Sequence, residues 1–321
     1  MRFQNNTVIF SAVLILVISS LAFSDWTEPV PLSEINTEFG EGWTFLSSDG
    51  MTLYFSRWET PAGHYAQLYM ATRTTQIDYF PGVTQIDELT YTGGHVRSAW
   101  VSPDNLRMYF LRTEPGAIRR IKVSKRESVS SPWEEPQNLT EINNLGNVDN
   151  PKLSSDELTI VFNVYLNKSD SLLCQATRSD RYLPFTNIRE ISELNTSNEK
   201  AVYLSLDGLT LYFARNDDGA SHNYMSKRPS INSYFGTPQL LNYWPEKFGL
   251  GCFSPDGKTA YLLKNDETTA EPGNHTDIYV SHYIFDDRYY FDIVKSTNSN
   301  NGMSTQTTFA AFPKADDTIP Q

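Results

Sequence analysis

Three carboxylates, Glu41, Asp149 and Glu199, are the side chains of this sequence best suited to bond chemistry. Each lies just ahead of one copy of a recurring Ser-x-Asp phrase. Two facing carboxylates can cleave a glycosidic bond, about 5–5.5 Å apart with retention or about 6.5–9.5 Å apart with inversion. The sequence does not fix their separation, and it contains no G-x-S-x-G, Gly-rich phosphate loop or H-E-x-x-H motif. A carbohydrate-active enzyme, a glycoside hydrolase or lyase, is therefore one of two hypotheses.

Other polar and aromatic side chains in the same segments and in neighbouring loops suit binding. They do not recur from copy to copy, so a repeated fold does not require them: Trp43, Trp58, His95, Arg97, Asn150 and Lys200. Mixed charges beside tryptophans would suit a sugar, a peptide or a polar protein surface. Together with the three carboxylates they form the predicted ligand-binding set. A solvated funnel whose charges pair with one another is the alternative interpretation.

The sequence predicts no cofactor and no metal site. Its five histidines are scattered without ligand spacing. The two cysteines, Cys174 and Cys252, are too few for a disulfide framework and match no zinc motif. Both lie in apolar runs, so we expect small buried residues on strands. The acidic loops at 216–223 and 265–277 lack the residue order of a calcium loop, which favours solvated turns.

The elements that must position these side chains are five copies of one phrase. They read LSSDGMTLYFSR (46–57), VSPDNLRMYFLR (101–112), LSSDELTIVFNV (153–164), LSLDGLTLYFAR (204–215) and FSPDGKTAYLLK (253–264). Their central aspartates, Asp49, Asp104, Asp156, Asp207 and Asp256, are 55, 52, 51 and 49 residues apart. Strand-rich units with a fixed period of this length are typical of propeller blades.

Each phrase reads as a strand, a tight turn and a second strand. The aspartate can accept a hydrogen bond from the backbone two residues on, and the glycine after it tolerates a positive φ. Asn105 is an acceptable substitute for that glycine, whereas Glu157 predicts a different turn in its copy. The second strand ends in a base in four copies: Arg57, Arg112, Arg215 and Lys264. This recurrence predicts a structural role, such as an ion pair between neighbouring units.

Further strands complete each unit. A third strand follows as QLYMATR, RIKVSKR, LLCQATR, HNYMSKR or DIYVSHY, and a fourth such as WEEPQNLTEIN (133–143) follows in most copies. The last unit has no clear fourth strand, but WTEPVPLSEIN (26–36) matches that fourth-strand pattern. We therefore predict an all-β, five-bladed β-propeller of four-stranded antiparallel blades, closed by the N-terminal strand pairing with the last blade. The segment IFDDRYYFDIVKS (284–296) competes for the same edge.

The pattern S-P-D-G before an aromatic strand, then DIYVS, then W-x-x-P-x-x-L, resembles the WD-like β-propeller repeats of the TolB type. The resemblance covers about Trp26 to Tyr283. It implies a propeller in an exported protein. Such repeats serve as docking platforms for proteins, as gates of serine peptidases and as scaffolds of some sugar-cleaving enzymes.

The two ends of the chain differ from this repeat region. Residues 1–24 hold one Arg and an apolar run, which predicts a signal peptide and a secreted or periplasmic location. The propeller is expected over 25–296 and a disordered tail over 297–321. The formal charge of -12 disfavours nucleic acid as a partner. We expect a monomer without membrane insertion after signal cleavage.

The loops that lead into the innermost strands gather at one face of a propeller. The loops between second and third strands reach the same face and add Trp58, His64, Glu114, Arg119, Tyr165, Asp217, His222, Asp266 and His275. The sequence thus predicts an exported, non-enzymatic propeller that binds a protein or glycan through this face.

Overall fold

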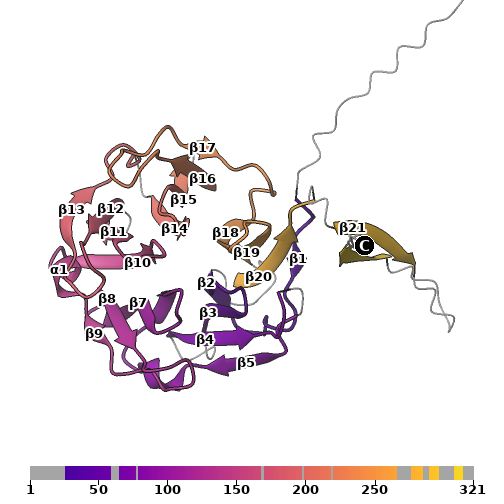
Figure 1. Ribbon diagram of the computed structural model, residues 1–321, viewed down its shortest axis with the longest axis horizontal. Helices are drawn as coiled ribbons and strands as arrows, with labels where there is room; N and C mark the ends of the chain where they lie inside the picture. Colours follow the sequence, from indigo (N-terminus) through magenta and orange to yellow (C-terminus); the bar gives the residue numbers. More distant parts are fainter. Residues whose placement is uncertain are drawn as a thin grey trace, which may run out of the picture.

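The computed structural model describes residues 26–58, 65–76, 79–167, 170–196, 199–217, 220–265 and 276–284, and the backbone of 289–295 and 307–313. Within these residues, five four-stranded antiparallel sheets surround a central axis (Figure 1). The predicted five-bladed β-propeller is confirmed. None of the helices in this part of the chain is long and apolar enough to span a membrane.

The five sheets are numbered as blades in chain order, each from its innermost strand outward. Blade 1 contains β2 (Glu41–Leu46), β3 (Thr52–Trp58), β4 (Ala66–Thr72) and β5 (Gly82–Gln85). Blade 2 contains β6 (Val96–Val101), β7 (Arg107–Glu114), β8 (Ile118–Lys125) and β9 (Gln137–Asn138). Blade 3 contains β10 (Asn147–Leu153), β11 (Thr159–Tyr165), β12 (Ser171–Thr177) and β13 (Thr186–Glu190). Blade 4 contains β14 (Lys200–Leu204), β15 (Thr210–Asp217), β16 (Ala220–Lys227) and β17 (Gln239–Leu240). Blade 5 contains β18 (Gly249–Phe253), β19 (Thr259–Asn265), β20 (Thr276–His282) and β1 (Val30–Pro31).

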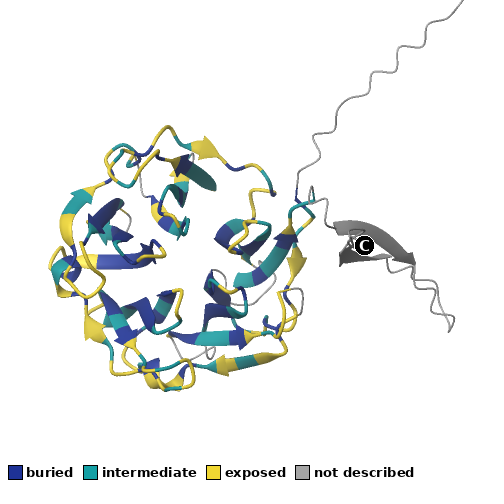
Figure 2. Cartoon of the chain, viewed as in Figure 1, coloured by how far each residue is buried: buried dark blue, intermediate teal, exposed yellow. Residues whose placement is uncertain are grey.

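Two short helices follow the outer strands of the first two blades, a 3-10 helix (Asp87–Leu89) and α1 (Thr140–Asn143). Buried residues concentrate on the inner strands of the blades, and exposed residues on the outermost ones (Figure 2). Cys174 and Cys252 are both buried on strands, as predicted, and both are free thiols.

The Ser-x-Asp turn joins the first and second strands in every blade, at the face called here the turn face. In blade 5, the Ser254 hydroxyl donates to Asp256 Oδ1 at 2.6 Å, and the Lys258 amide donates to the same oxygen at 3.1 Å. Gly257 has a φ of +71°. Because the antiparallel strands alternate in direction, the loops into the innermost strands lie at the opposite end of the channel, at the loop face.

The turn of blade 3 corrects one expectation. Glu157 has a φ of +62°, so it adopts the same left-handed conformation as the glycines and the turn is unchanged. Its buried carboxylate accepts hydrogen bonds from Arg107 Nε at 2.8 Å and from the Tyr109 hydroxyl at 3.1 Å, both on blade 2. A side chain usually avoids this backbone conformation. The charge-assisted contacts to the neighbouring blade offset that cost.

The ring closes as predicted. β1 pairs antiparallel with β20, with Val30 opposite Val280, and an isolated bridge joins Trp26 to Tyr283. Trp26 and the neighbouring Leu32 and Ile35 are buried in the described structure. β21 (Tyr289–Lys295) pairs with β22 (Thr307–Pro313), so the competing segment does not take this edge.

Most residues of the two predicted end segments lie outside the described residues. Residues 1–24 lie outside the described residues. The expected tail over 297–321 contains β22, and its other residues also lie outside the description.

A recurring asparagine anchors the end of the outer strands. The Asn36 side chain accepts from the Ile278 amide and donates to the Ile278 carbonyl, both at 2.9 Å. Asn143 does the same to Ile121 in blade 2. The carboxamide thus donates and accepts as the backbone N–H and C=O of a further strand residue would, at the point where the short outer strand has ended. This explains the EIN ending shared by the N-terminal segment and the fourth strand of blade 2.

Candidate ligand-binding face

The innermost strands are bulged near the loop face. Their pairing register shifts at the same level in every blade: between Gly42 and Phe45, Arg97 and Trp100, Asp149 and Lys152, Ala201 and Tyr203, and Leu250 and Cys252. Three residues in these bulges have positive φ although none is glycine: Trp43 at 50°, Ser98 at 58° and Asn150 at 53°. Bulges re-aim side chains, and such backbone persists only where the surroundings hold it. The neighbouring side chains on these strands are therefore set at fixed positions around the mouth of the channel.

A buried carboxylate faces two guanidinium groups at this mouth. Arg97 Nη2 on β6 lies 2.8 Å from Asp149 Oδ2 on β10, and Arg119 Nη1 on β8 lies 3.9 Å from the same oxygen. The Arg119 guanidinium also lies over the Tyr165 ring, 3.9 Å from its centroid. One carboxylate cannot balance two such cations. Within the described part of the chain, positive charge is therefore in surplus around Asp149.

The positive charge of Arg97 also lowers the pKa of two neighbouring basic groups, His95 and Lys200. The pKa of His95 is lowered, first by burial and then by the positive charges of Arg97 and Arg119. Its Nδ1 accepts from the Ala66 amide at 3.0 Å, which suits a neutral ring. The Lys200 side chain reaches solvent, yet partial desolvation and then Arg97 lower the pKa of its ammonium, while Asp149 opposes the shift. Among the described residues, cations thus outnumber carboxylates around Asp149, although the whole chain is acidic.

Two tryptophans flank the same cluster. The ring centroids of Trp43 and Trp58 are 5.0 Å apart, and the Arg97 guanidinium lies 4.2 Å from a Trp43 ring centroid. Both indoles are half-buried. An aromatic surface beside guanidinium groups can hold a ligand through ring stacking and charge together.

Asn150 belongs to an internal network. Its Oδ1 accepts from the Ser98 hydroxyl at 3.0 Å, and its Nδ2 donates to Asn163 Oδ1 at 3.3 Å. Asn163 in turn donates to the Glu199 carbonyl at 2.7 Å. The network links the innermost parts of blades 2, 3 and 4. The sequence offered no signal for Ser98 or Asn163, because single polar residues on strands look unremarkable.

The carboxylate of Glu41 is buried and is not accessible from the channel mouth. Its fully buried carboxylate accepts from the Thr37 hydroxyl at 2.6 Å and from Arg57 Nε at 2.8 Å. Arg57 Nη2 also donates to the Ile35 carbonyl at 2.7 Å. Burial raises the pKa of Glu41, and the contacts with Thr37 and Arg57 oppose that shift.

Glu199 repeats this arrangement in blade 4. Its Oε1 accepts from the Thr196 hydroxyl at 2.7 Å and from Arg215 Nε at 2.9 Å, and Arg215 Nη2 reaches the Leu194 carbonyl at 2.8 Å. The predicted structural role of Arg57 and Arg215 is therefore confirmed. The ion pair itself lies within one blade, which corrects the expected pair between blades, and the carbonyl contact reaches the connection from the preceding blade.

The predicted set thus divides in two. The structure brings six of its members together around the mouth: Trp43, Trp58, His95, Arg97, Asp149 and Lys200. It assigns Glu41, Glu199 and Asn150 to internal contacts. His64, Asp266 and His275 lie outside the described residues. In the part of the chain that the structure describes, no group of three or more His, Cys, Asp and Glu could hold a metal ion.

Comparisons with known proteins address the fold. No protein-family profile matches the chain, and no curated protein matches it. A family 117 glycoside hydrolase from Zobellia galactanivorans superposes with a TM-score of 0.56 at 10% identity, covering 83% of this chain and 92% of that one. The catalytic domain of a GH62 α-L-arabinofuranosidase from Coprinopsis cinerea gives a TM-score of 0.53 at 12% identity, covering 80% and 96%.

TolB from Acinetobacter baumannii is similar at a TM-score of 0.45 and 14% identity, over 72% of this chain. The chain spans about half of that protein, 53% of its length. At these identities the likeness concerns the fold alone. The chain therefore shares its propeller fold with the two glycoside hydrolases above.

Proposed function

We propose that the protein binds an acidic glycan at its loop face without cleaving it. The surplus of cations at the channel mouth carries this proposal. In the part of the chain that the structure describes, Arg97, Arg119 and Lys200 surround the carboxylate of Asp149, in a chain of formal charge -12. Guanidinium groups bind carboxylate and sulfate through paired, charge-assisted hydrogen bonds. Trp43 and Trp58 add the aromatic surface against which a sugar ring can pack.

The rival function is a carbohydrate-active enzyme that uses the carboxylates as acid and base or nucleophile. Several structural neighbours are described as glycoside hydrolases, so the fold admits that chemistry. In this chain, Glu41 and Glu199 each accept from one threonine and one arginine in matching positions of the repeat. Matching partners in two blades favour a structural role. Asp149 is paired with Arg97, which favours binding over bond cleavage.

The proposal includes export of the protein, with residues 1–24 as its signal peptide. An acidic polysaccharide would then meet it outside the cytoplasm. An acidic protein surface would meet the same cations, and the experiment below separates the two.

Isothermal titration calorimetry tests this function with three probes: an oligogalacturonate, a sulfated oligosaccharide and neutral xylotriose. We expect an acidic probe to bind more tightly than xylotriose, with affinity that falls as salt rises. The double variant Arg119→Ala, Lys200→Ala should weaken binding about tenfold or more, since charge-assisted hydrogen bonds contribute roughly 1.5–3 kcal/mol each. Arg181→Ala, which removes an exposed guanidinium from the turn face, is the matched control.

Equal affinity for neutral and acidic sugars, or unchanged affinity in the double variant, would overturn the proposal. Binding of an acidic peptide but of no glycan would preserve the site and overturn the ligand class. Release of reducing ends from any of the three sugars would favour the enzyme.

A further inference from the structure

In four blades, an arginine side chain occupies the same position at the turn face. This position, between a turn carbonyl and an aromatic ring, is called here the niche. The arginine directly follows the third strand, and its Nε donates to a turn carbonyl: Arg73 to Gly50 at 2.8 Å, Arg126 to Asn105 at 2.7 Å, Arg178 to Glu157 at 2.7 Å and Arg228 to Gly208 at 2.9 Å. Each guanidinium also lies over an aromatic ring, 4.2–4.7 Å from its centroid: Phe80, Trp133, Phe185 and Phe235, respectively. The fold thus repeats one guanidinium-binding arrangement four times.

The arginine also reaches the preceding blade. Arg178 Nη2 donates to the Tyr109 hydroxyl of blade 2 at 2.9 Å, and Arg228 Nη1 donates to Gln175 of blade 3 at 2.9 Å. The niche therefore lies between neighbouring blades, and the arginine fills it.

Blade 5 departs from this pattern. Tyr283 stands at the arginine position, because its amide donates to the Lys258 carbonyl as the Arg228 amide donates to the Leu209 carbonyl, both at 2.9 Å. The corresponding ring is Trp26, and Tyr283 meets it edge-on with centroids 5.6 Å apart. A phenol cannot supply the five donors of a guanidinium. No side chain of the described residues donates to the Gly257 carbonyl, the counterpart of the four carbonyls that arginines hold.

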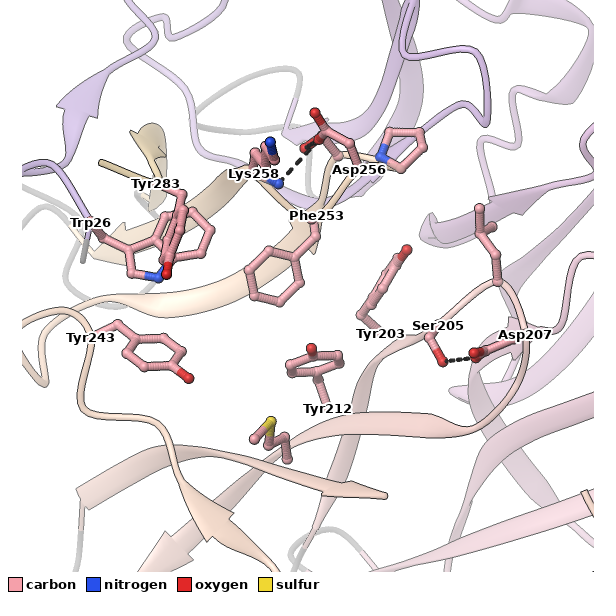
Figure 3. A pocket seen from close by; sticks show the side chains of 15 residues that line it. Trp26, Tyr203, Ser205, Asp207, Tyr212, Tyr243, Phe253, Asp256, Lys258 and Tyr283 are labelled. Atoms are coloured by element: carbon pink, nitrogen blue, oxygen red, sulfur yellow. Dashed lines mark hydrogen bonds between the residues drawn. The ribbon is translucent and has the colours of Figure 1, made fainter. Parts of the chain in front are cut away.

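A pocket of about 660 Å³ lies at this position, between blades 4 and 5. Figure 3 shows aromatic side chains from both blades and from the N-terminal segment around it, among them Trp26, Tyr203, Tyr212, Tyr243, Phe253 and Tyr283. Tyr212 corresponds to Tyr109, whose hydroxyl accepts a hydrogen bond from Arg178 at the interface of blades 2 and 3. Among the described residues, the pocket therefore retains the aromatic walls and the acceptors of the niche without a guanidinium.

Two exposed carboxylates line the same pocket, Asp207 and Asp256. Each uses Oδ1 to close its own turn. In blade 2 the second oxygen of the corresponding aspartate, Asp104 Oδ2, lies 2.8 Å from Arg107 Nη2. The molecule thus shows that this turn aspartate can hold a guanidinium with its remaining oxygen.

The charge around the pocket differs from that at other interfaces in two ways. Glu193 and Glu141 lie beside the filled niches and accept the amides of Phe235 and Phe185, whereas Tyr243 faces Trp26 in blade 5. Lys258 adds one ammonium to the lining. Among the described lining residues two carboxylates outnumber one ammonium, but the positive charge of Arg228 also acts on Asp207, so Asp256 is the carboxylate best placed to balance a bound cation.

We propose that this pocket binds the guanidinium of an arginine side chain presented by a partner polypeptide. The four internal arginines define most of the chemistry, an aromatic face, a turn carbonyl and a tyrosine hydroxyl, and the contact of Arg107 with Asp104 adds the turn carboxylate. The pocket is larger than a single guanidinium and adjoins the exposed turns, which leaves room for residues that flank the arginine. The site is independent of the glycan site, because it lies at the opposite end of the channel.

Calorimetry with three blocked pentapeptides, Gly-Gly-X-Gly-Gly with X as arginine, lysine or citrulline, tests the site in the full chain. We expect the arginine peptide to bind at least tenfold more tightly than the citrulline peptide, which has the same shape without the charge. Tyr283→Arg should refill the niche from within, abolish peptide binding and raise the melting temperature. Tyr182→Arg adds the same charge at an exposed position outside the pocket and should change neither.

Asp256→Asn provides a second variant that does not depend on refilling the niche. It retains an oxygen that can close the turn and should weaken arginine binding about fivefold or more. Equal binding of the arginine and citrulline peptides, no binding at millimolar concentration, or a preference for lysine would each overturn the assignment. So would full peptide binding by a folded Tyr283→Arg protein.

Discussion

At the scale of single residues, Lys152 is the clearest exception to the repeat. It stands four residues before the turn aspartate, where other blades have Phe45, Trp100, Tyr203 and Cys252. Lys152 is only 4% exposed. Burial lowers the pKa of its ammonium to about 8, although the neighbouring Cys252 partly opposes the shift. A buried cation at a position suited to an aromatic ring should reduce stability.

Lys152→Met should therefore raise the free energy of unfolding at pH 7 by roughly 2–3 kcal/mol. The pKa of Lys152 falls from 10.5 to about 8 on folding. Between these pH values the unfolded chain binds a proton that the folded chain has released, so the stability of the natural protein rises with pH. The variant should lack this rise. Urea titrations at pH 7 and pH 10 measure both effects, with exposed Lys227→Met as the control. A variant less stable than the natural protein at pH 7 would contradict this account.

At the scale of elements, side-chain carboxamides extend the short outer strands. β1 has two residues, yet Asn36 adds two hydrogen bonds to its blade, donating to the Ile278 carbonyl and accepting from the Ile278 amide. Asn195 makes the same pair of contacts with Leu173 in blade 3. A blade can thus complete its pairing with few strand residues in its outermost element.

Asn36→Ala should lower the free energy of unfolding by about 1–3 kcal/mol, because it leaves the Ile278 amide without its partner and removes one of the two donors to the Ile278 carbonyl, which keeps the Leu32 amide. Hydrogen exchange should show faster exchange of the Ile278 amide, and a urea titration should show the stability loss. Exposed Asn144→Ala is the matched control and should have little effect. If the Ile278 amide stays equally protected from hydrogen exchange in the variant, the contacts of Asn36 are not needed to hold this strand.

At the scale of the whole molecule, the ring depends on a latch made from both ends of the blade region. Trp26, Leu32 and Ile35 are buried against the last blade or its neighbours. Burial of each large apolar side chain contributes roughly 1.5–3 kcal/mol before conformational entropy is subtracted. Closure also covers the outer edge of β20, which would otherwise expose unpaired backbone groups.

Deletion of residues 25–36 should lower the melting temperature by on the order of 10 °C or more. Differential scanning calorimetry measures this change. A rearranged chain in which residues 26–36 follow Tyr283 through a short linker should regain most of the stability, because the same strand would again lie beside β20. An unchanged melting temperature after the deletion would be incompatible with the latch.

Much of the fold could be predicted because its information is local and repeated. The Ser-x-Asp phrase specifies its own turn through contacts within five residues, and five copies at a steady period imply a ring. The turn at Glu157 could not be predicted, because the partners that hold its positive φ, Arg107 and Tyr109, lie about 50 residues away. The local preference of glutamate argued against a positive φ, but the ion pair with the distant Arg107 stabilises that conformation.

The candidate sites show the same division. The amino-acid sequence alone determined the blades, their order, the N-terminal latch and the place where functional loops gather, because hydrophobic period and turn chemistry act over a few residues. It also displayed Tyr283 where four other units end in arginine. Only the tertiary structure decided that Glu41 and Glu199 are internally paired, that cations outnumber carboxylates around Asp149 and that a pocket exists beside Trp26. Burial, charge balance and empty space depend on which distant side chains meet, and that is settled when the blades pack.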